Sequence, residues 1–177
     1  MKEVELKFKV DSMNPILSLL EEKHCVLSDV LDQQDVIYVP DLNHVESVDG
    51  SIWLRIRREN DRIELNYKKQ GPVKMSSKEI EFGIDSFEKA KELLEEFGYQ
   101  KWVEVHKKRR TTKYKNYNIC LDEVERLGSF MEIEVLVPDD DTKDYSDELF
   151  QVAWEFGIPE DDRVNSHYDT MMWELEK

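Results

Sequence analysis

The chain has 177 residues, a length typical of one domain that can bury a sizeable core. Its 40 Asp and Glu residues outnumber its 25 Lys and Arg residues, which gives a formal net charge of -15. This charge argues against non-specific binding to nucleic acid or to an anionic membrane surface. We therefore predict a single domain over residues 1–177, with two small lobes as the alternative. Any basic cluster in it needs a specific anionic ligand or interleaved acids.

The two cysteines, Cys25 and Cys120, lie in apolar contexts without the spacing of a metal site. We expect buried thiols rather than metal ligands or a disulfide, as in a reducing compartment. No apolar run approaches the roughly 20 residues that span a bilayer, and the acidic amino terminus lacks the apolar segment of a signal peptide. These features predict a soluble, cytoplasmic protein with no membrane partner.

Residues 3–10 read EVELKFKV, in which charged and apolar side chains alternate. Successive side chains of a strand point to opposite faces, so Glu3, Glu5, Lys7 and Lys9 would share one face. On this segment alone, an edge strand with a solvated charged face is the favoured interpretation. However, the same alternation recurs later, so that at least six strands carry ordered charge of both signs.

Residues 14–40 predict a short helix and a second strand. Asn14 resembles an N-cap before Pro15 at the first helical position, and an apolar stripe continues to near Lys23. The β-branched and aromatic run of residues 35–39 is typical of a strand and is ended by Pro40. We predict a polar loop at residues 41–50.

Residues 51–58 and 62–70 predict a hairpin, and residues 78–84 resume the alternation after a polar linker. Asp85 and Glu88 resemble a capping box before an amphipathic helix that Gly98 ends. Residues 102–112, 117–123 and 130–137 are three more strands, and residues 145–156 carry the last helical apolar stripe. Short turns favour antiparallel pairing, and eight strands can close into a small barrel. We predict an α+β fold, mainly antiparallel β, with a closed eight-stranded antiparallel barrel and three main helices packed outside.

Charged faces that point into such a barrel would place basic and acidic side chains around one lumen. Buried charge is costly unless the groups pair, stay hydrated or bind something charged. Arg and Lys from several strands suit an extended polyanion such as a triphosphate, and carboxylates on the first and last strands suit Mg²⁺ or Mn²⁺. This combination favours metal-assisted phosphoryl or nucleotidyl transfer, whereas cross-strand salt bridges on the outside of a barrel are the alternative.

Several motifs occur in a specific order. They are EVELK at 3–7, QD at 34–35 with Tyr38, LRIR at 54–57, NYK at 66–68, EIE at 79–81, KKR at 107–109 and CLDEVERLGSFMEIE at 120–134. The first is an ExExK signature, and with the later motifs the chain resembles the CYTH domain family over residues 1 to about 170. This fold is shared by class IV adenylyl cyclases and thiamine triphosphatases, which are also called triphosphate tunnel metalloenzymes.

The resemblance implies a tunnel that binds a triphosphate on basic side chains and two Mg²⁺ or Mn²⁺ ions on carboxylates. The implied metal ligands or near neighbours are Glu3, Glu5, Asp122, Glu132 and Glu134. The implied substrate contacts are Lys7, Arg55, Arg57, Lys68, Lys107 and Arg109. Among all of these residues, Glu5, Lys7, Arg57 and Lys107 are the candidates for a direct catalytic role.

The sequence also departs from the family pattern. Ser77 stands where many members carry Arg, and residues 165–168 read NSHY where many read Arg-Ser-Tyr. A bulge in the strand at 102–112 could bring Lys108 and Arg110 to the site instead of Lys107 and Arg109. We expect His167 to be a packing or surface residue, and the apolar residues 171–173 to belong to the core.

The stretch from Asp122 to Glu134 resembles the cyclase branch, so the leading hypothesis is an enzyme, a class IV-type adenylyl cyclase. The ribose 3′-hydroxyl of ATP would attack the α-phosphorus to give cyclic AMP and pyrophosphate. The alternative is a triphosphatase that hydrolyses thiamine triphosphate, inorganic triphosphate or a nucleotide. A third hypothesis is a module that binds polyphosphate without turnover. Apolar side chains on the outer helices leave a homodimer open.

Overall fold

A computed structural model describes residues 2–45, 52–70 and 77–177 of the chain; the side chains of His44, Gln70 and residues 77–79 also lie outside the described part. Contacts divide the chain into two compact units. Unit 1 contains Met1–Leu31 and Lys107–His167, and unit 2 contains Asp32–His106 and Tyr168–Lys177. The single domain expected over residues 1–177 stays a prediction.

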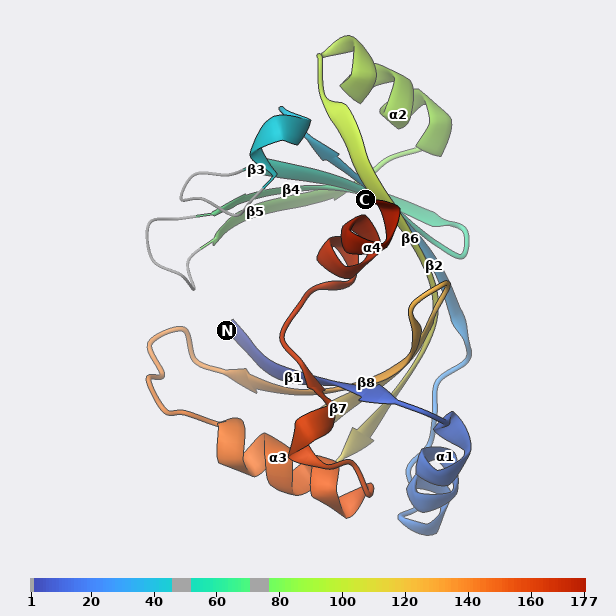
Figure 1. The fold of residues 1–177 in the computed structure, drawn as a ribbon, viewed down its shortest axis with the longest axis vertical. Coiled ribbons are helices and arrows are strands. Elements are labelled where there is room, and N and C mark those ends of the chain that lie inside the picture. The colour runs from blue at the N-terminus through green and yellow to red at the C-terminus, as the bar shows by residue number, and fades with distance from the viewer. Residues whose placement is uncertain (1, 46–51, 71–76) are drawn as a thin grey trace. The chain divides into compact units, whose positions relative to one another are not determined.

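The strands form one antiparallel-dominated sheet in the order β5-β4-β3-β2-β6-β7-β8-β1-β9 (Figure 1). The pairing of β1 with β8 joins segments that are far apart in the sequence. The strands are β1 (Lys2–Val10), β2 (Leu31–Val39), β3 (Ile52–Glu59), β4 (Arg62–Gln70), β5 (Ser77–Gly83), β6 (Gln100–Tyr114), β7 (Tyr117–Val124), β8 (Gly128–Val137) and β9 (Arg163–Val164).

The ninth strand corrects the predicted count of eight. β9 has only two residues, and it pairs with β1 at Lys7 and Phe8. In the described ranges the strand order begins at β5 and ends at β9, so hydrogen bonds do not close the sheet and the closed barrel is not shown. Closure requires the terminal strands to pair with each other, whereas β9 takes part of the edge of β1.

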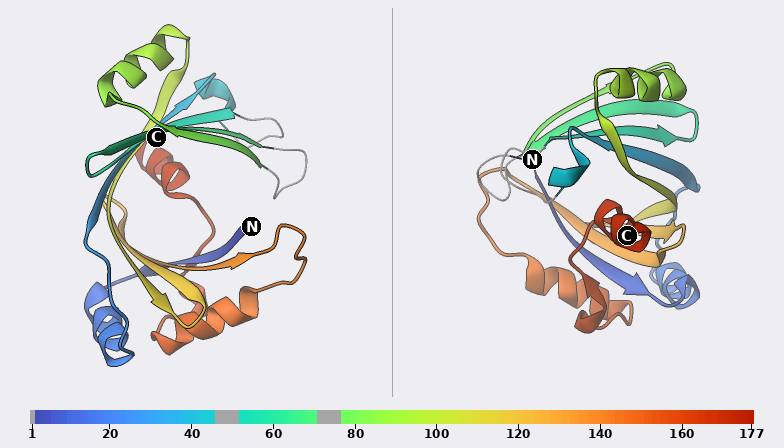
Figure 2. Two further views of the ribbon diagram at one scale, coloured as in Figure 1. Left: turned by 180° about the vertical axis from the view of Figure 1, so that it is seen from behind. Right: turned by 45° about the horizontal axis from the view of Figure 1, so that its top comes forward.

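The core of unit 1 lies between the apolar face of its strands and two helices. Helices α1 (Met13–Glu22) and α3 (Ser146–Glu155) lie against the same side of β1, β7 and β8 in all views (Figures 1 and 2). Phe8 and Ile133 from the strands pack with Leu20 and Leu149 from the helices, and all four side chains are fully buried. The apolar half of the alternating pattern therefore faces the helices and leaves the charged half on the other face.

Unit 2 has its own apolar core. Helix α2 (Phe87–Glu96) contributes Phe87 to a cluster that includes Tyr38 and Ile56 from β2 and β3. Helix α4 (Tyr168–Glu176), which the sequence analysis did not predict, brings Trp173 into edge-to-face contact with Trp102 at 6.3 Å between ring centroids. Met172 is buried, as expected for the carboxyl-terminal apolar group.

Two predicted helix caps are shifted. Ser12, rather than Asn14, caps α1, and its hydroxyl accepts a hydrogen bond from the Asn14 N–H at 3.3 Å. Ser86, rather than Asp85, caps α2. In both cases two residues with good capping side chains lie close together, so composition does not decide between them. Within the described ranges, no helix combines the length and the apolar character that a membrane crossing requires.

Candidate active site

Strand register places charged side chains together on one face of unit 1. β1 pairs with β8 so that Glu5 is opposite Glu134 and Lys7 is opposite Glu132. β8 pairs in turn with β7, where Cys120 is opposite Glu132. The other face of these strands carries the apolar core. We call the first surface the charged face; it carries Glu3, Glu5, Lys7, Lys107, Arg109, Cys120, Asp122, Glu132 and Glu134.

An ion-pair network crosses the charged face from β6 to β1. Arg109 donates from Nε to Asp122 Oδ1 at 2.7 Å, and its Nη2 contacts both Asp122 and Glu132. Lys7 Nζ lies 3.3 Å from Glu132 Oε1, and Lys107 Nζ lies 3.5 Å from Asp122 Oδ2. Asp122 is 0% exposed and Glu132 is 5% exposed, so either carboxylate would be costly to bury alone. In this network, the positive charges of the Lys and Arg side chains balance the negative charges of the buried carboxylates.

The pairing of β6 with β7 decides which basic residues of the KKR segment face the carboxylates. The register runs without interruption from Lys107 to Tyr114. Lys108 is exposed, and Arg110 donates from Nε to the backbone oxygen of Ser28 at 3.2 Å. The structure therefore puts Lys107 and Arg109, and not Lys108 and Arg110, beside the carboxylates.

The charged face also carries Glu5 and Glu134, two carboxylates with raised pKa values. Burial raises the pKa of Glu134, the negative charge of Glu3 raises it further, and a hydrogen bond from Cys120 opposes the shift. The side chain of Glu5 reaches solvent, yet the protein atoms around its carboxyl group raise the pKa of Glu5, and the charge of Glu132 adds to this effect. A divalent cation bound among these groups would relieve the repulsion.

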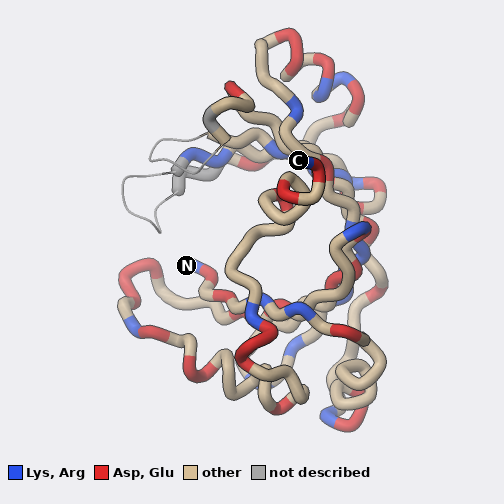
Figure 3. Tube along the Cα trace, viewed as in Figure 1, with Lys and Arg blue, Asp and Glu red and all other residues tan. Residues whose placement is uncertain are grey.

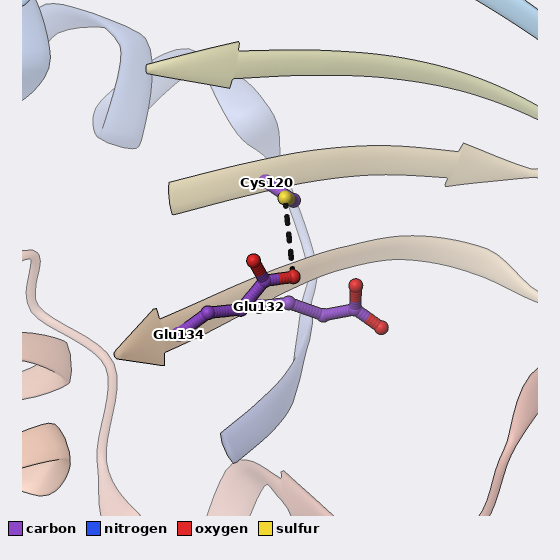
Figure 4. A group of neighbouring side chains, drawn as sticks. All are labelled: Cys120, Glu132 and Glu134. Carbon is purple, nitrogen blue, oxygen red and sulfur yellow. Dashed lines mark hydrogen bonds between the residues drawn. The ribbon is translucent and has the colours of Figure 1, made fainter. Parts of the chain in front are cut away.

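One group of side chains on the charged face has the spacing of a metal site. One ligand atom from each of Cys120, Glu132 and Glu134 lies within 4.8 Å of the others (Figure 4). The Cys120 thiol donates to Glu134 Oε1 at 3.4 Å, and burial raises the pKa of this thiol. Carboxylate oxygens are the donors that Mg²⁺ and Mn²⁺ prefer, so this group can hold a divalent cation.

Cys120 is the residue of this group that the sequence analysis missed. It was expected to be a buried thiol without a metal role, and it is indeed buried, whereas Cys25 is half-buried. The available signal was its position two residues before Asp122, which puts both side chains on the same face of β7. That signal becomes useful only when the register shows that β8 brings Glu132 opposite Cys120.

The segment after β9 lies beside the charged face. The backbone oxygen of Ser166 accepts a hydrogen bond from Lys7 Nζ at 3.3 Å. His167 is exposed, and its charge acts on the Glu5 carboxyl group in the direction opposite to that of burial and Glu132. The departure from the family pattern at residues 165–168 therefore lies close to predicted site residues of β1.

Three of the predicted substrate contacts, Arg55, Arg57 and Lys68, belong to unit 2. Arg57 forms a bidentate ion pair with the buried Asp35 at 2.7 and 2.6 Å. Arg55 donates from Nε to Asn66 Oδ1 at 3.4 Å, whereas Lys68 is exposed. The side chains of Ser77 and Glu79 lie outside the described residues. Figure 3 shows basic and acidic positions interleaved along the chain, as expected for a strongly acidic protein with local ion pairs.

These features define an α+β protein with an antiparallel sheet whose charged face can hold a divalent cation beside a cluster of basic groups. The family model described as the CYTH domain matches residues 1–168. The chain therefore belongs to the CYTH domain family, as its motifs indicated.

Proteins with a similar sequence or fold carry related names. A Methanocaldococcus jannaschii protein named "Putative adenylate cyclase" is 26% identical over 171 residues, which cover 95% of this chain and 97% of the relative. A solved structure of a "putative adenylate cyclase" from Vibrio parahaemolyticus has a TM-score of 0.77 at 23% identity and covers 99% of this chain and 98% of its own. A Hippeastrum protein described as a "Putative adenylyl cyclase" with a dominant triphosphatase activity has a TM-score of 0.64 at 17% identity, with 99% and 95% coverage.

Proposed function

We propose that this chain is a metal-dependent enzyme acting on a triphosphate, and that it is a class IV-type adenylyl cyclase converting ATP into cyclic AMP and pyrophosphate. The observation that carries the proposal is the charged face of unit 1, where carboxylates with raised pKa values adjoin a cluster of Lys and Arg side chains. Membership in the CYTH family and the adenylate cyclase name of the Methanocaldococcus jannaschii relative support it.

The carboxylates of the charged face are the proposed metal ligands for two Mg²⁺ or Mn²⁺ ions. A bound divalent cation would lower the pKa of an attacking hydroxyl group and neutralise charge on the phosphates. Glu134 and Glu5 fit this role because burial raises the pKa of both carboxyl groups, and the negative charges of Glu3 and Glu132, respectively, add to this effect. A cation would stabilise the ionised forms. Asp122 is held by two nitrogen atoms of the Arg109 guanidinium, so a metal would have to bind through the remaining lone pairs of its oxygens or displace Arg109. The full proposed set is Glu3, Glu5, Asp122, Glu132 and Glu134.

The basic side chains would bind and orient the triphosphate. Lys7, Lys107 and Arg109 each form an ion pair with a carboxylate of the protein. A phosphate group, which has a higher charge density, can replace that carboxylate as the partner of the basic side chain. We also propose Arg55, Arg57 and Lys68 as triphosphate contacts, as the family resemblance implied. The closed tunnel that the resemblance implied is likewise part of this proposal. In the reaction the ribose 3′ oxygen bonds to the α-phosphorus, the bond from that phosphorus to the pyrophosphate oxygen breaks, and the hydroxyl proton passes to solvent.

A triphosphatase is the second candidate. The same cations and carboxylates can present the terminal phosphorus of thiamine triphosphate, inorganic triphosphate or a nucleotide to water. The observation that favours this candidate is that the Hippeastrum protein, which has a similar fold, is described as having a dominant triphosphatase activity.

Product analysis tests both candidates. The purified chain would be incubated with Mg²⁺ or Mn²⁺ and, separately, with ATP, thiamine triphosphate and inorganic triphosphate, and the products would be separated by chromatography. Cyclic AMP with pyrophosphate supports the cyclase, and orthophosphate supports the hydrolase. Absence of product from every substrate would leave neither enzyme hypothesis standing.

Matched variants tie the activity to the charged face. Glu5→Gln and Glu134→Gln each remove one carboxylate charge without changing the size of the side chain, and both should abolish metal-dependent turnover. Glu123→Gln removes the same charge from an exposed position on the opposite face of β7 and should keep full turnover. Equal loss of activity in all three variants would show that the charged face has no special role.

A further inference from the structure

The thiol of Cys120 lies inside the carboxylate group of the proposed metal site. Cys120 is 4% exposed, Glu132 is 5% exposed and Glu134 is 9% exposed. Figure 4 shows the sulfur directed at the Glu134 carboxylate across neighbouring strands. Neither the proposed cyclase reaction nor the proposed hydrolysis uses a thiol, so its place among the carboxylates calls for a separate explanation.

The three donors combine ligand types that different cations prefer. Mg²⁺ and Mn²⁺ are hard and gain little from sulfur, whereas Zn²⁺, Co²⁺ and Cd²⁺ accept both thiolate and carboxylate ligands. We propose that Cys120 is a direct ligand for such thiophilic divalent cations, together with Glu132 and Glu134, and that these cations compete there with Mg²⁺ or Mn²⁺. The inference rests on the proposed function only for the identity of the competing metals.

The distances suit this donor set. Metal–sulfur and metal–oxygen bonds of about 2.3 and 2.0 Å in a tetrahedral site place neighbouring ligand atoms roughly 3.5 Å apart. The Cys120 sulfur already lies 3.4 Å from Glu134 Oε1. The three ligand atoms lie within 4.8 Å of one another, so only a small movement of Glu132 is needed.

The ion pairs of Glu132 do not prevent metal binding. Its two oxygens face Lys7 and Arg109, but each carboxylate oxygen has two lone pairs and can accept a cation and a hydrogen bond together. On binding, the sulfur–hydrogen bond of Cys120 breaks, a sulfur–metal bond forms and the proton passes to solvent. No electrons are gained or lost by the protein or the cation.

A cavity adjoins two of these ligands, Cys120 and Glu134. A space of about 650 Å³ is lined by residues of unit 1 that include Cys120, Glu134, Asn118 and Cys25. Cys25 and Cys120 are the only cysteines in the sequence, and both line this cavity. Cys25 therefore serves as the control thiol, because it lines the same cavity but does not belong to the group of Cys120, Glu132 and Glu134.

Titration with Co²⁺ tests the assignment by a readout that does not depend on turnover. A cobalt–thiolate bond produces a charge-transfer absorption band in the near ultraviolet that carboxylate ligands alone do not produce. We expect this band in the unaltered chain and in Cys25→Ser, and its absence in Cys120→Ser. Calorimetry should show Co²⁺ affinity falling at least about tenfold in Cys120→Ser, because loss of outer ligand partners alone costs that much or more.

The other outcomes overturn the proposal. A band that survives in Cys120→Ser or disappears in Cys25→Ser would assign the thiol ligand to Cys25, and Co²⁺ binding without a band would leave carboxylates alone as ligands. If Cys120→Ser fails to fold by circular dichroism, Glu134→Gln replaces it, and an unchanged Co²⁺ affinity in that variant would overturn the site. Turnover supported by Mn²⁺ with no cobalt band would overturn this inference and leave the proposed function intact. A cobalt band without turnover would support this inference and overturn the proposed function.

Discussion

Replacement of Glu134 by Gln should change stability in opposite directions with and without a divalent cation. The pKa of Glu134 is raised first by burial and then by the charge of Glu3. Ionisation of this carboxyl group at neutral pH therefore costs folding free energy when no metal is bound, and Gln keeps the shape without the charge. We expect the metal-free Glu134→Gln variant to unfold at a higher temperature than the unaltered chain.

The metal-bound comparison has a calculable size. At a Mn²⁺ concentration of about one hundred times the dissociation constant, binding adds about 2.7 kcal/mol to the free energy of unfolding. Loss of a ligand that weakens affinity about 100-fold reduces this gain to about 0.4 kcal/mol at the same concentration. Because each kcal/mol shifts the midpoint of a chain of this size by roughly 2–4 °C, a Mn²⁺-dependent shift of roughly 5–11 °C should fall to about 1–2 °C.

Thermal melts followed by circular dichroism, in chelator and in Mn²⁺, measure both effects. Glu123→Gln is the matched control, because it removes an equal charge from an exposed site on the other face of β7. It should retain the Mn²⁺-dependent shift. A Glu134→Gln variant that Mn²⁺ stabilises as much as the unaltered chain would refute the assignment of this carboxylate to a metal site.

Arg109→Gln should lower the free energy of unfolding by up to about 3–5 kcal/mol, because it leaves buried Asp122 with Lys107 and buried Glu132 with Lys7 and so compensates both carboxylates less well. Arg110→Gln, which loses one hydrogen bond to backbone, should cost about 1 kcal/mol. Equal midpoints in urea would contradict the network. In the presence of chelator, the stabilisation by Glu134→Gln should shrink as the pH falls through the raised pKa of Glu134 towards the ordinary value of 4.5, because Glu134 of the folded unaltered chain then becomes protonated. A stability difference that does not change with pH would exclude this cause. Arg57→Ala should weaken tripolyphosphate binding roughly tenfold or more without raising the Mn²⁺ requirement, and an unchanged dissociation constant would remove Arg57 from the anion site. Mn²⁺ and tripolyphosphate together should raise the melting midpoint more than either alone, and no shift with any of them would mean that the charged face binds neither.

Alternation in the sequence predicted which side chains share a face. Lys7 and Phe8 are adjacent in β1, and the structure places Lys7 in the ion-pair network and Phe8 in the helix-covered core. The resemblance to the CYTH family implied Lys107 and Arg109, with Lys108 and Arg110 as the alternative if the strand were bulged. The uninterrupted register of β6 with β7 presents Lys107 and Arg109, as alternate residues, to one side. These inferences succeeded because side-chain direction in a strand is a local property.

Strand partners and short elements could not be predicted in the same way. The contact of Lys7 with Glu132 depends on the register between strands far apart in the sequence, and many registers preserve the same alternation. β9 has two residues and no periodicity to detect. The role now proposed for Cys120 was hidden for the same reason, since only the pairing of β7 with β8 brings its thiol to the carboxylates.

The resting ion pairs link the binding of metal to the binding of anion. Glu132 is shared by Lys7 and Arg109, so its negative charge is balanced within the protein. A divalent cation held by Glu132 would balance that charge instead and would leave the two basic side chains with an excess of positive charge, which a phosphate group could neutralise. An anion that draws Lys7 and Arg109 away from Glu132 leaves, conversely, a carboxylate that attracts the cation. Because coupling free energy is reciprocal, each ligand should strengthen the binding of the other by the same factor. In the ion-pair network, protein cations and protein carboxylates therefore balance each other, as the cation and the phosphates of a bound metal–triphosphate complex would balance them instead.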